Sequence, residues 1–171
     1  LAAEKSNKKL PIETLTEVLD TSVFNSSFFF IFGDLFKQYG SDKSTTHNYY
    51  LIYSSVLEKN EDKSINILEV GLGTNNIDVL SNMGVEGKPG ASLRAFRDAC
   101  RQANVYGADI DKRILFTEER IKTYFLDQTQ PDTFTSLKTE LNNIKFDLII
   151  DDGLHNSEAN INTLNFALEM L

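Results

Sequence analysis

The stretch INILEVGLG, residues 65–73, decides the fold class. Its first six residues form an apolar, β-branched run that stops at a glycine turn, as a buried strand does. Three further apolar runs follow, each ending in an acidic residue: 104–109, 122–127 and 145–151. Helical patterns separate or follow them: 92–103, 114–120, 131–143 and 157–171. Strands alternating with helices of this length predict right-handed crossovers and an α/β fold with a Rossmann-like, doubly wound parallel sheet.

The apolar positions of the helical patterns predict which faces are buried. In the helix at 92–103, Leu93, Phe96 and Cys100 fall on one face. The last helix is expected to turn four residues inward: Ile161, Leu164, Ala167 and Leu168. A further helix at 44–58, opened by Ser/Thr caps, carries four residues at helical spacing: Tyr49, Ile52, Tyr53 and Val56. The tyrosine stripe beside His47, which comprises Tyr49, Tyr50 and Tyr53, is more often packing than a substrate pocket.

The first part of the chain differs in composition from the rest. Residues 1–60 are expected to form a helical segment rich in Phe and Tyr, and residues 61–171 the Rossmann-like core. A short helix is predicted over 11–20, because proline is tolerated in a first turn. The Phe-rich stretch 22–40 must be covered by the domain's own sheet or by a partner subunit. We therefore expect a homo-oligomer that forms through this stretch.

The overall composition narrows the function classes. The 17 Lys+Arg residues against 25 Asp+Glu give a net charge of −8, which repels phosphate backbones, so nucleic-acid binding is not expected. No apolar run approaches the roughly 20 residues that a membrane-spanning helix needs, so no membrane partner is expected. The single cysteine, Cys100, excludes an internal disulfide framework. Together with the lack of a basic-then-apolar leader, it favours a cytoplasmic location.

Gly71 and Gly73 follow the first predicted strand, at the edge of a parallel sheet where ligands bind. Glycine lets the backbone turn sharply and lets a ligand approach closely, although an ordinary strand-to-loop turn explains the pair equally well. The third glycine of a dinucleotide fingerprint would fall at Asn76, and no P-loop pattern occurs. Pyrophosphate binding is therefore disfavoured. The connection 74–91 exceeds the usual loop length and is expected to be functional.

Asp109 closes the second predicted strand, where a carboxylate can accept both hydroxyls of a ribose bound over the first turn. A solvated acid or a helix cap is the other interpretation. Acidic residues also mark the other strand ends, at Glu69, Asp127 and Asp151–Asp152. Sheet packing alone does not require so many carboxylates at one edge. Together with the glycines, they favour the ribose role for Asp109.

Four ordered segments resemble the motifs of class I S-adenosylmethionine-dependent methyltransferases: ILEVGLG (67–73), YGADID (106–111), FLDQ (125–128) and FDLIIDDG (146–153). Finer patterns resemble one branch, the macrocin and mycinamicin sugar O-methyltransferases: YGSDK (39–43), HNY (47–49), GASLR (90–94) and IIDDGLH (149–155). The similarity runs from about Phe36 to Leu171. It implies a transferase of natural product biosynthesis that methylates a hydroxyl of a sugar or glycosylated small molecule.

The resemblance also implies which residues surround S-adenosylmethionine: Glu69, Gly71, Gly73, Gly90, Ser92, Asp109, Asp127, Gln128 and Asp151. The first three would line the methionine part, and Asp109 would hold the ribose. Asp127 would face the adenine amino group, with the backbone of Gln128 beside it. Gly90 and Ser92 would offer N–H donors at a helix N-terminus to the methionine carboxylate. The resemblance further points to three cofactor-side or lid residues: Lys43, His47 and Tyr50.

For the chemistry, the resemblance makes Asp152 a magnesium ligand and His155 the general base. A hydroxyl is a poor nucleophile until its proton is removed, and histidine has a suitable pKa for that role. Magnesium prefers oxygen ligands and can acidify and orient a hydroxyl. A hydrogen-bonded surface histidine is the plainer interpretation of His155, and capping of the following helix is that of Asp151–Asp152.

Two other functions stay open. One is a nicotinamide-dependent Rossmann oxidoreductase, against which Glu69 before the glycines and Asn76 in place of the third glycine both count. The other is a cofactor-binding domain that has lost catalysis and acts in assembly, which the Phe-rich stretch favours.

The strand count predicts an incomplete sheet. Sheets of the class I order 3-2-1-4 continue past the fourth strand, so the run at 145–151 should be an exposed edge and the C-terminal strands should be missing from this chain. The acidic partners of magnesium would lie past Leu171. We therefore expect these residues alone to bind S-adenosylmethionine weakly and to show no metal-dependent transfer.

Overall fold

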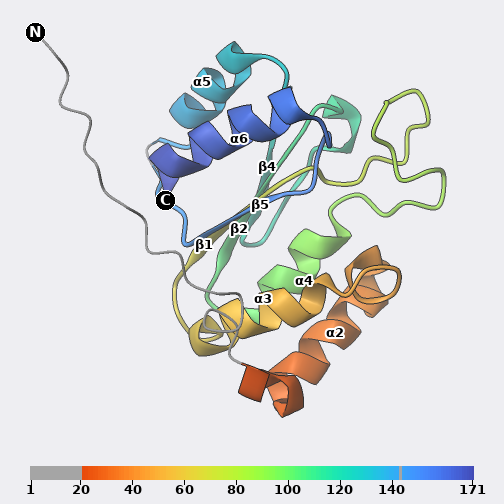
Figure 1. Ribbon diagram of the computed structural model, residues 1–171, viewed down its shortest axis with the longest axis vertical. Helices are drawn as coiled ribbons and strands as arrows, with labels where there is room; N and C mark the ends of the chain where they lie inside the picture. Colours follow the sequence, from red (N-terminus) through yellow and green to blue (C-terminus); the bar gives the residue numbers. More distant parts are fainter. Residues whose placement is uncertain (1–20, 143) are drawn as a thin grey trace, which may run out of the picture.

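The computed structural model describes residues 21–142 and 144–171 (Figure 1). The helix predicted over 11–20 lies outside the described residues. None of the described helices is long and apolar enough to cross a membrane. The predicted division between residues 60 and 61 and the predicted self-association stay predictions.

The sheet has five strands in the order β3-β4-β2-β1-β5. Four are parallel: β1 (Asn66–Val70), β2 (Asn104–Asp109), β4 (Ile121–Phe125) and β5 (Leu148–Asp151). They correspond to the four predicted strands in the predicted order, and β5 forms an edge within the described residues. The register pairs Val70 with both Ala108 and Asp151, so the parallel strands end at one edge. The chain passes from β1 to β2 on one side of it and later returns to β5 on the other side. The strand order therefore reverses at β1, and ligands bind at such a switch point.

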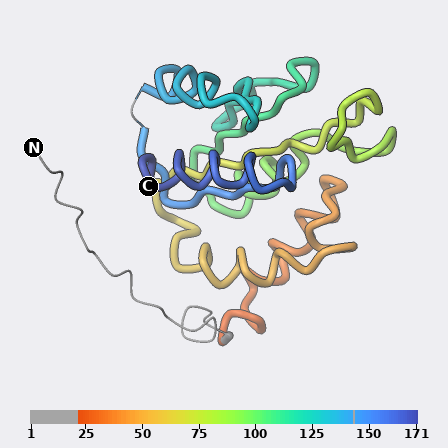
Figure 2. Tube along the Cα trace, turned by 45° about the horizontal axis from the view of Figure 1, so that its top comes forward, coloured from red at the N-terminus to blue at the C-terminus, as the bar shows by residue number. Residues whose placement is uncertain are grey.

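Helices cover both faces of the sheet (Figure 1). One face carries α2 (Ser27–Tyr39), α3 (Tyr49–Leu57) and α4 (Ala91–Ala99). The other carries α5 (Pro131–Glu140) and α6 (Ser157–Met170), which Figure 2 shows on the opposite side of the sheet from α2 and α3. No helix or strand interrupts residues 71–90, which confirms the long connection before α4.

The core between the sheet and α2, α3 and α4 is aromatic. Phe32 stacks obliquely on Phe36 and Phe96, with ring centroids 4.7 and 5.6 Å apart. All three rings are fully buried, as are Leu93 and Cys100, which confirms the predicted face of α4. Much of the Phe-rich stretch is thus covered by the protein's own core, whereas Phe30 and Ile31 remain more than half exposed.

The helix predicted over 114–120 is wrong. A 3₁₀ turn over Lys112–Ile114 is followed by the short strand β3 (Thr117–Glu118), antiparallel to β4. The hydroxyl and amide of Thr123 bond to Phe116, with Phe116 N 2.6 Å from Thr123 Oγ1 and Thr123 N 3.1 Å from Phe116 O. Pairing with a neighbouring strand therefore overrides the local helical pattern.

The predicted inward face of α6 is also wrong. Ile161, Leu164 and Leu168 are 57, 57 and 63% exposed and Ala167 is half-buried, whereas Thr163 and Phe166 face the sheet. Polar contacts set this rotation: Asn162 Nδ2 donates to the Gln128 carbonyl (2.9 Å), and Thr163 Oγ1 accepts from the Gln128 amide (2.7 Å). Periodicity does not register such contacts, because they depend on a distant strand end.

The helix predicted over 44–58 begins later than expected. α3 starts at Tyr49 after Asn48, whose side chain makes no capping hydrogen bond, so the predicted Ser/Thr caps are wrong. Tyr49, Ile52 and Val56 are each more than a third exposed, while the buried residues of this helix are Ser54, Ser55 and Leu57. Of the four residues predicted at helical spacing, Tyr53 alone packs partly against the aromatic core. The helices predicted over 92–103 and 131–143 also end earlier, at Ala99 and Glu140.

Candidate functional site

A cavity of about 370 Å³ opens at the carboxyl ends of the parallel strands. The turn after β1, the ends of β2, β4 and β5, the loop 74–91 and the segment 40–43 form its wall. Eight of the predicted site residues line it: Lys43, Gly71, Gly73, Ser92, Asp109, Asp127, Gln128 and Asp152. Four others lie beside or behind the wall: Glu69, Gly90, Asp151 and His155.

Gly71 has a structural reason to be glycine. Its φ of 92° lies in the region that side chains disfavour, and an added Cβ would overlap the carbonyl of Asp152. The turn after β1 and the end of β5 therefore approach each other closely. This approach brings Gly71 and Asp152 to the same wall of the cavity.

Asp109 fixes the same turn from the other side. Its Oδ2 accepts a hydrogen bond from Leu72 N (2.7 Å), and its Oδ1 accepts one from Asp111 N (2.8 Å). The residue is 7% exposed, and burial raises the pKa of its carboxyl. A carboxylate held by two backbone donors at the second strand end is in place to meet a ligand lying over the first turn.

Lys43 crosses the cavity wall from the N-terminal segment and contacts two carboxylates. Its Nζ forms an ion pair with Asp152 and lies 3.3 Å from Glu69 Oε1. Burial raises the pKa of Glu69, whose side chain is fully buried. Burial alone would lower the pKa of Lys43, but the charges of Glu69 and Asp152 raise it well above its ordinary value. Lys43 therefore carries a permanent positive charge at this wall.

Glu69 lies directly behind Lys43 and Ser92. Ser92 Oγ donates a hydrogen bond to Glu69 Oε2, which fixes the first turn of α4 against the end of β1. Among the described residues, Glu69 Oε1 is buried and receives no geometrically ideal hydrogen bond, and Lys43 Nζ at 3.3 Å is its charged partner.

Gln128 and Asp151 face each other rather than the cavity centre. The amide of Gln128 donates to Asp151 Oδ1 (2.8 Å), and its Oε1 accepts from Leu154 N (2.7 Å). These bonds join the ends of β4 and β5. Asp127, by contrast, is half-buried in the wall, with its Oδ1 bonded to the amide and hydroxyl of Thr129 at 2.9 and 2.7 Å.

His155 is placed beside Asp152 but at the surface. Its side chain is 71% exposed, and its Nε2 lies 3.9 Å from Asp152 Oδ1. Asp152 and Leu154 line the cavity, whereas His155 itself is not part of its lining. The other histidine, His47, stacks on Tyr49 with ring centroids 4.9 Å apart and lies 3.6 Å from Asp42.

The donor set for magnesium is incomplete. Nowhere in residues 21–142 and 144–171 do three or more His, Cys, Asp or Glu side chains form a group that could hold a metal ion. The carboxylate of Asp152 is engaged by Lys43. The described residues therefore do not fit a magnesium ion on their own.

S-Adenosylmethionine fits the described residues better. This cofactor carries a cationic sulfonium and an ammonium group, and the wall offers the carboxylates of Asp109 and Asp127. The first turn of α4 faces the cavity through Ser92, as an anion site at a helix N-terminus requires.

Asp111 is a site residue that sequence reasoning missed. Its Oδ2 accepts from Thr74 Oγ1 (2.6 Å) and Asn76 Nδ2 (2.7 Å), which fixes the start of the loop 74–91. Arg113 donates to Asp111 Oδ1 (2.7 Å) and holds the pKa of that carboxyl well below its ordinary value. The repeated acid in Asp109-Ile-Asp111 was the available signal, since the second acid closes no strand.

Two curated proteins that this chain resembles in sequence are O-methyltransferases. No protein-family model matches the sequence. Over 118 residues the chain is 30% identical to the 8-demethyl-8-alpha-L-rhamnosyl tetracenomycin-C 2'-O-methyltransferase of Streptomyces olivaceus, covering 69% of this chain and 29% of that protein. Over 106 residues it is 28% identical to the demethylmacrocin O-methyltransferase of Streptomyces fradiae, covering 62% of this chain and 24% of that enzyme. The chain thus spans less than a third of the length of these relatives.

The solved structures agree on the fold. The MycE methyltransferase from the mycinamycin biosynthetic pathway, in complex with Mg and SAH, superposes with a TM-score of 0.66 at 21% identity, over 82% of this chain and 36% of that one. A second MycE structure, which also contains mycinamycin VI, gives the same values. The chain therefore has the class I methyltransferase fold and resembles the sugar O-methyltransferases in sequence.

Proposed function

We propose that this protein takes part in the transfer of a methyl group from S-adenosylmethionine to a hydroxyl of a sugar or glycosylated small molecule. The observation that carries the proposal is the cavity at the switch point of the sheet, where Gly71, Ser92 and Asp109 share one wall. The named relatives are sugar O-methyltransferases, and a MycE structure holds both SAH and a mycinamycin. No observation favours nicotinamide binding, because the dinucleotide-binding fingerprint has a third glycine at the position that Asn76 occupies here.

Three groups of this chain would hold the cofactor. The carboxylate of Asp109 would accept the ribose hydroxyls, while its two backbone bonds keep it in position. The backbone N–H of Ser92, in the first turn of α4, would meet the methionine carboxylate. Asp127 would face the adenine from the end of β4.

His155 is the proposed general base. When bound, S-adenosylmethionine supplies an electrophilic methyl group on its sulfonium. The acceptor hydroxyl becomes a competent nucleophile once a ring nitrogen of His155 takes its proton; the new O–C bond would form as the methyl–sulfur bond breaks, with S-adenosylhomocysteine as the leaving group. The ring is 71% exposed beside Asp152, which leaves room for an acceptor. Asp152, 3.9 Å from Nε2, would stabilise the imidazolium that results.

We derive no step through magnesium. Asp152 is the ligand that the resemblance implies, and within the described chain its carboxylate is paired with Lys43. Adding Mg²⁺ to the protein during a titration with SAH, and repeating it with EDTA, tests whether binding depends on the ion. An affinity that rises with Mg²⁺ and falls with EDTA would show that SAH binding depends on the ion.

Calorimetry tests the cofactor part of the proposal. The purified protein should bind SAH and S-adenosylmethionine, and NAD⁺ should give no heat at the same concentrations. Binding of NAD⁺ in preference to SAH would overturn the proposal in favour of an oxidoreductase.

A histidine variant tests catalysis separately from binding. His155→Ala should lower turnover of a glycosylated acceptor by about 10²–10⁴-fold while SAH affinity stays near that of the wild type. His155→Gln is the comparison, because its amide is polar but does not take a proton at neutral pH. Near-normal turnover in either variant would remove His155 from the mechanism, and binding without any turnover in the wild type would favour the assembly role.

A further inference from the structure

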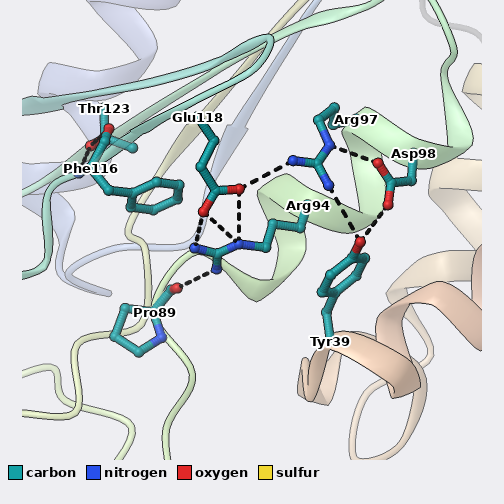
Figure 3. Close-up of polar contacts among 8 residues, drawn as sticks. All are labelled: Tyr39, Pro89, Arg94, Arg97, Asp98, Phe116, Glu118 and Thr123. Carbon is teal, nitrogen blue, oxygen red and sulfur yellow. Dashed lines mark hydrogen bonds and ion pairs between the residues drawn. The ribbon is translucent and has the colours of Figure 1, made fainter.

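Arg94, the last residue of the GASLR motif, touches neither the cavity nor any residue of the proposed chemistry. Its guanidinium lies between the end of the loop 74–91 and the strand β3 (Figure 3). Nη1 donates to the Pro89 carbonyl at 3.0 Å. Nε and Nη2 donate to the carboxylate of Glu118, with Nη2 2.6 Å from Oε1. One planar group thus joins the loop end to the sheet.

The residue next to Pro89 has no freedom to move independently. Gly90 has a φ of 70°, and an added Cβ would lie 2.5 Å from Cε1 of the Phe116 ring. The guanidinium of Arg94 packs against the same ring, 4.5 Å from its centroid. On the other side, Gly90 N donates to the Leu72 carbonyl at 2.8 Å, in the turn after β1. Gly90 is therefore held between the β1 turn and the Phe116 ring.

Ser92 follows two residues later, and its position depends on this junction. Its hydroxyl bonds Glu69 and its residue lines the cavity. A shift of Gly90 would move the N-terminus of α4, and with it the N–H group proposed to meet the methionine carboxylate. The geometry of Arg94 thus bears on the cofactor site without any direct contact.

We propose that Arg94 is a positioning residue for the cofactor site. By bonding Pro89 and Glu118 together against Phe116, it fixes the junction between the loop 74–91 and α4, and so the first turn of α4. This inference rests on the proposed function, because it assigns Arg94 an effect on cofactor binding. It extends that function to a residue outside the cavity.

Arg97 supplies a matched control. It lies one turn further along α4 and donates to the same Glu118 carboxylate, with Nη1 3.1 Å from Oε2. Its other bonds go to Asp98 and Tyr39, away from the loop (Figure 3). Removing Arg97 therefore disturbs the same network and the same helix but leaves the Pro89 contact in place.

The test compares Arg94→Met, Arg94→Lys and Arg97→Met with the wild type. SAH affinity is measured by calorimetry well below the unfolding midpoints, and amide hydrogen exchange is followed over residues 84–94. We expect both Arg94 variants to bind SAH at least about tenfold more weakly, as loss of a supporting residue around a site commonly does. Lysine should not rescue, because it lacks the planar fork. Arg97→Met should change affinity less than about twofold, and faster exchange near Gly90 should appear in the Arg94 variants alone.

Equal SAH affinities and equal exchange in Arg94→Met and Arg97→Met would overturn the inference. A wild type that binds no SAH would overturn the proposed function instead, and the exchange measurement would still report whether Arg94 fixes the junction. If Arg94→Met does not fold, Arg94→Gln and Glu118→Gln replace it. Wild-type affinity in both of those variants would also overturn the inference.

Discussion

Two groups of charged residues flank α4, and each contains one glutamate. The buried cluster comprises Lys43, Glu69, Ser92 and Asp152, and the outer network comprises Tyr39, Arg94, Arg97, Asp98 and Glu118. Glu69 faces the ammonium group of Lys43, and Glu118 faces the guanidinium groups of Arg94 and Arg97. Yet burial raises the pKa of Glu69, whereas hydrogen bonds from Arg94 lower that of Glu118.

The difference follows from exposure to water. The side chain of Glu69 is 0% exposed and that of Glu118 is 36% exposed. Removing a carboxylate from water opposes its charge more than one nearby ammonium favours it, and a partly hydrated carboxylate gains from every donor. Burial thus opposes the charge of Glu69, and a buried ion pair of this kind is weak evidence for a gain in stability. The position of the buried cluster at the cavity wall points to a role in arranging the site.

The largest effect should come from removing the cation of the buried cluster. Lys43→Met leaves Glu69 and Asp152 uncompensated and should lower the free energy of unfolding by about 3–5 kcal/mol. Urea unfolding at neutral pH measures it. Lys37→Met is the control, since Lys37 pairs with Asp34 across exposed surface and should cost less than about 0.5 kcal/mol. Similar losses in both variants would break the distinction between the two groups.

Asp109 is a buried carboxylate whose hydrogen bonds come from backbone N–H groups, so it tests how burial affects stability without an ion pair. Both of its oxygens accept backbone N–H bonds, so the amide in Asp109→Asn would turn its NH₂ toward one of those donors. We expect an unfolding free energy lower by about 1–3 kcal/mol and a similar loss in SAH binding. In Asp127→Asn the bonds to Thr129 use one oxygen and can be kept, so its stability should barely change. An unchanged SAH affinity for Asp109→Asn would mean that the ribose does not lie over the first turn.

The two glutamates should give pH dependences of opposite sign. Glu118 has a folded pKa below its ordinary value of 4.5, so its stabilisation is present above that pH and is lost as the pH falls through the folded pKa. Glu69 has a folded pKa above 4.5, so the folded state binds more protons and stability falls as the pH rises from 4.5 through the folded pKa.

Urea unfolding of Glu69→Gln and Glu118→Gln from about pH 3 to about pH 8 separates these two trends. In Glu118→Gln, the unfolding free energy should fall less at acid pH than it does in the wild type. In Glu69→Gln, it should fall less as the pH rises above 4.5. If the pH dependence of the unfolding free energy changed in the same direction in both variants, burial would not be the cause of the raised pKa of Glu69.

The parallel strands could be predicted because burial on both faces leaves an uninterrupted apolar run in the sequence. Ile67, Leu68 and Val70 are all almost fully buried. The short strand β3 left no such run, since it is defined by its pairing with β4. The buried face of α6 could not be predicted from its apolar residues, because two hydrogen bonds to Gln128 fix the rotation of this helix.

The candidate site was predictable where chemistry follows the strand ends. The register of a parallel sheet places Gly71, Asp109 and Asp127 at one edge, and all three line the cavity. The partners of Asp152 and Gln128 were not predictable in the same way. Lys43 and Thr163 reach them from segments distant along the chain, and periodicity does not report such contacts.

Ionic strength provides the smallest and most specific test of the comparison. Arg97 donates to Glu118 at 3.1 Å and to Asp98 at 2.6 Å from a partly exposed position, so Arg97→Met should lower the unfolding free energy by only about 0.2–1 kcal/mol. Raising NaCl to about 1 M shortens the Debye length from about 8–10 Å to about 3 Å and should reduce that loss. The larger loss in Lys43→Met should stay nearly constant, because salt does not enter the buried cluster. Each pair of values is measured by urea unfolding at low and high salt, with the wild type at both. A salt-sensitive loss at Lys43 would mean that water and ions reach the carboxylates behind the cavity wall, and the two groups would then differ in degree rather than in kind.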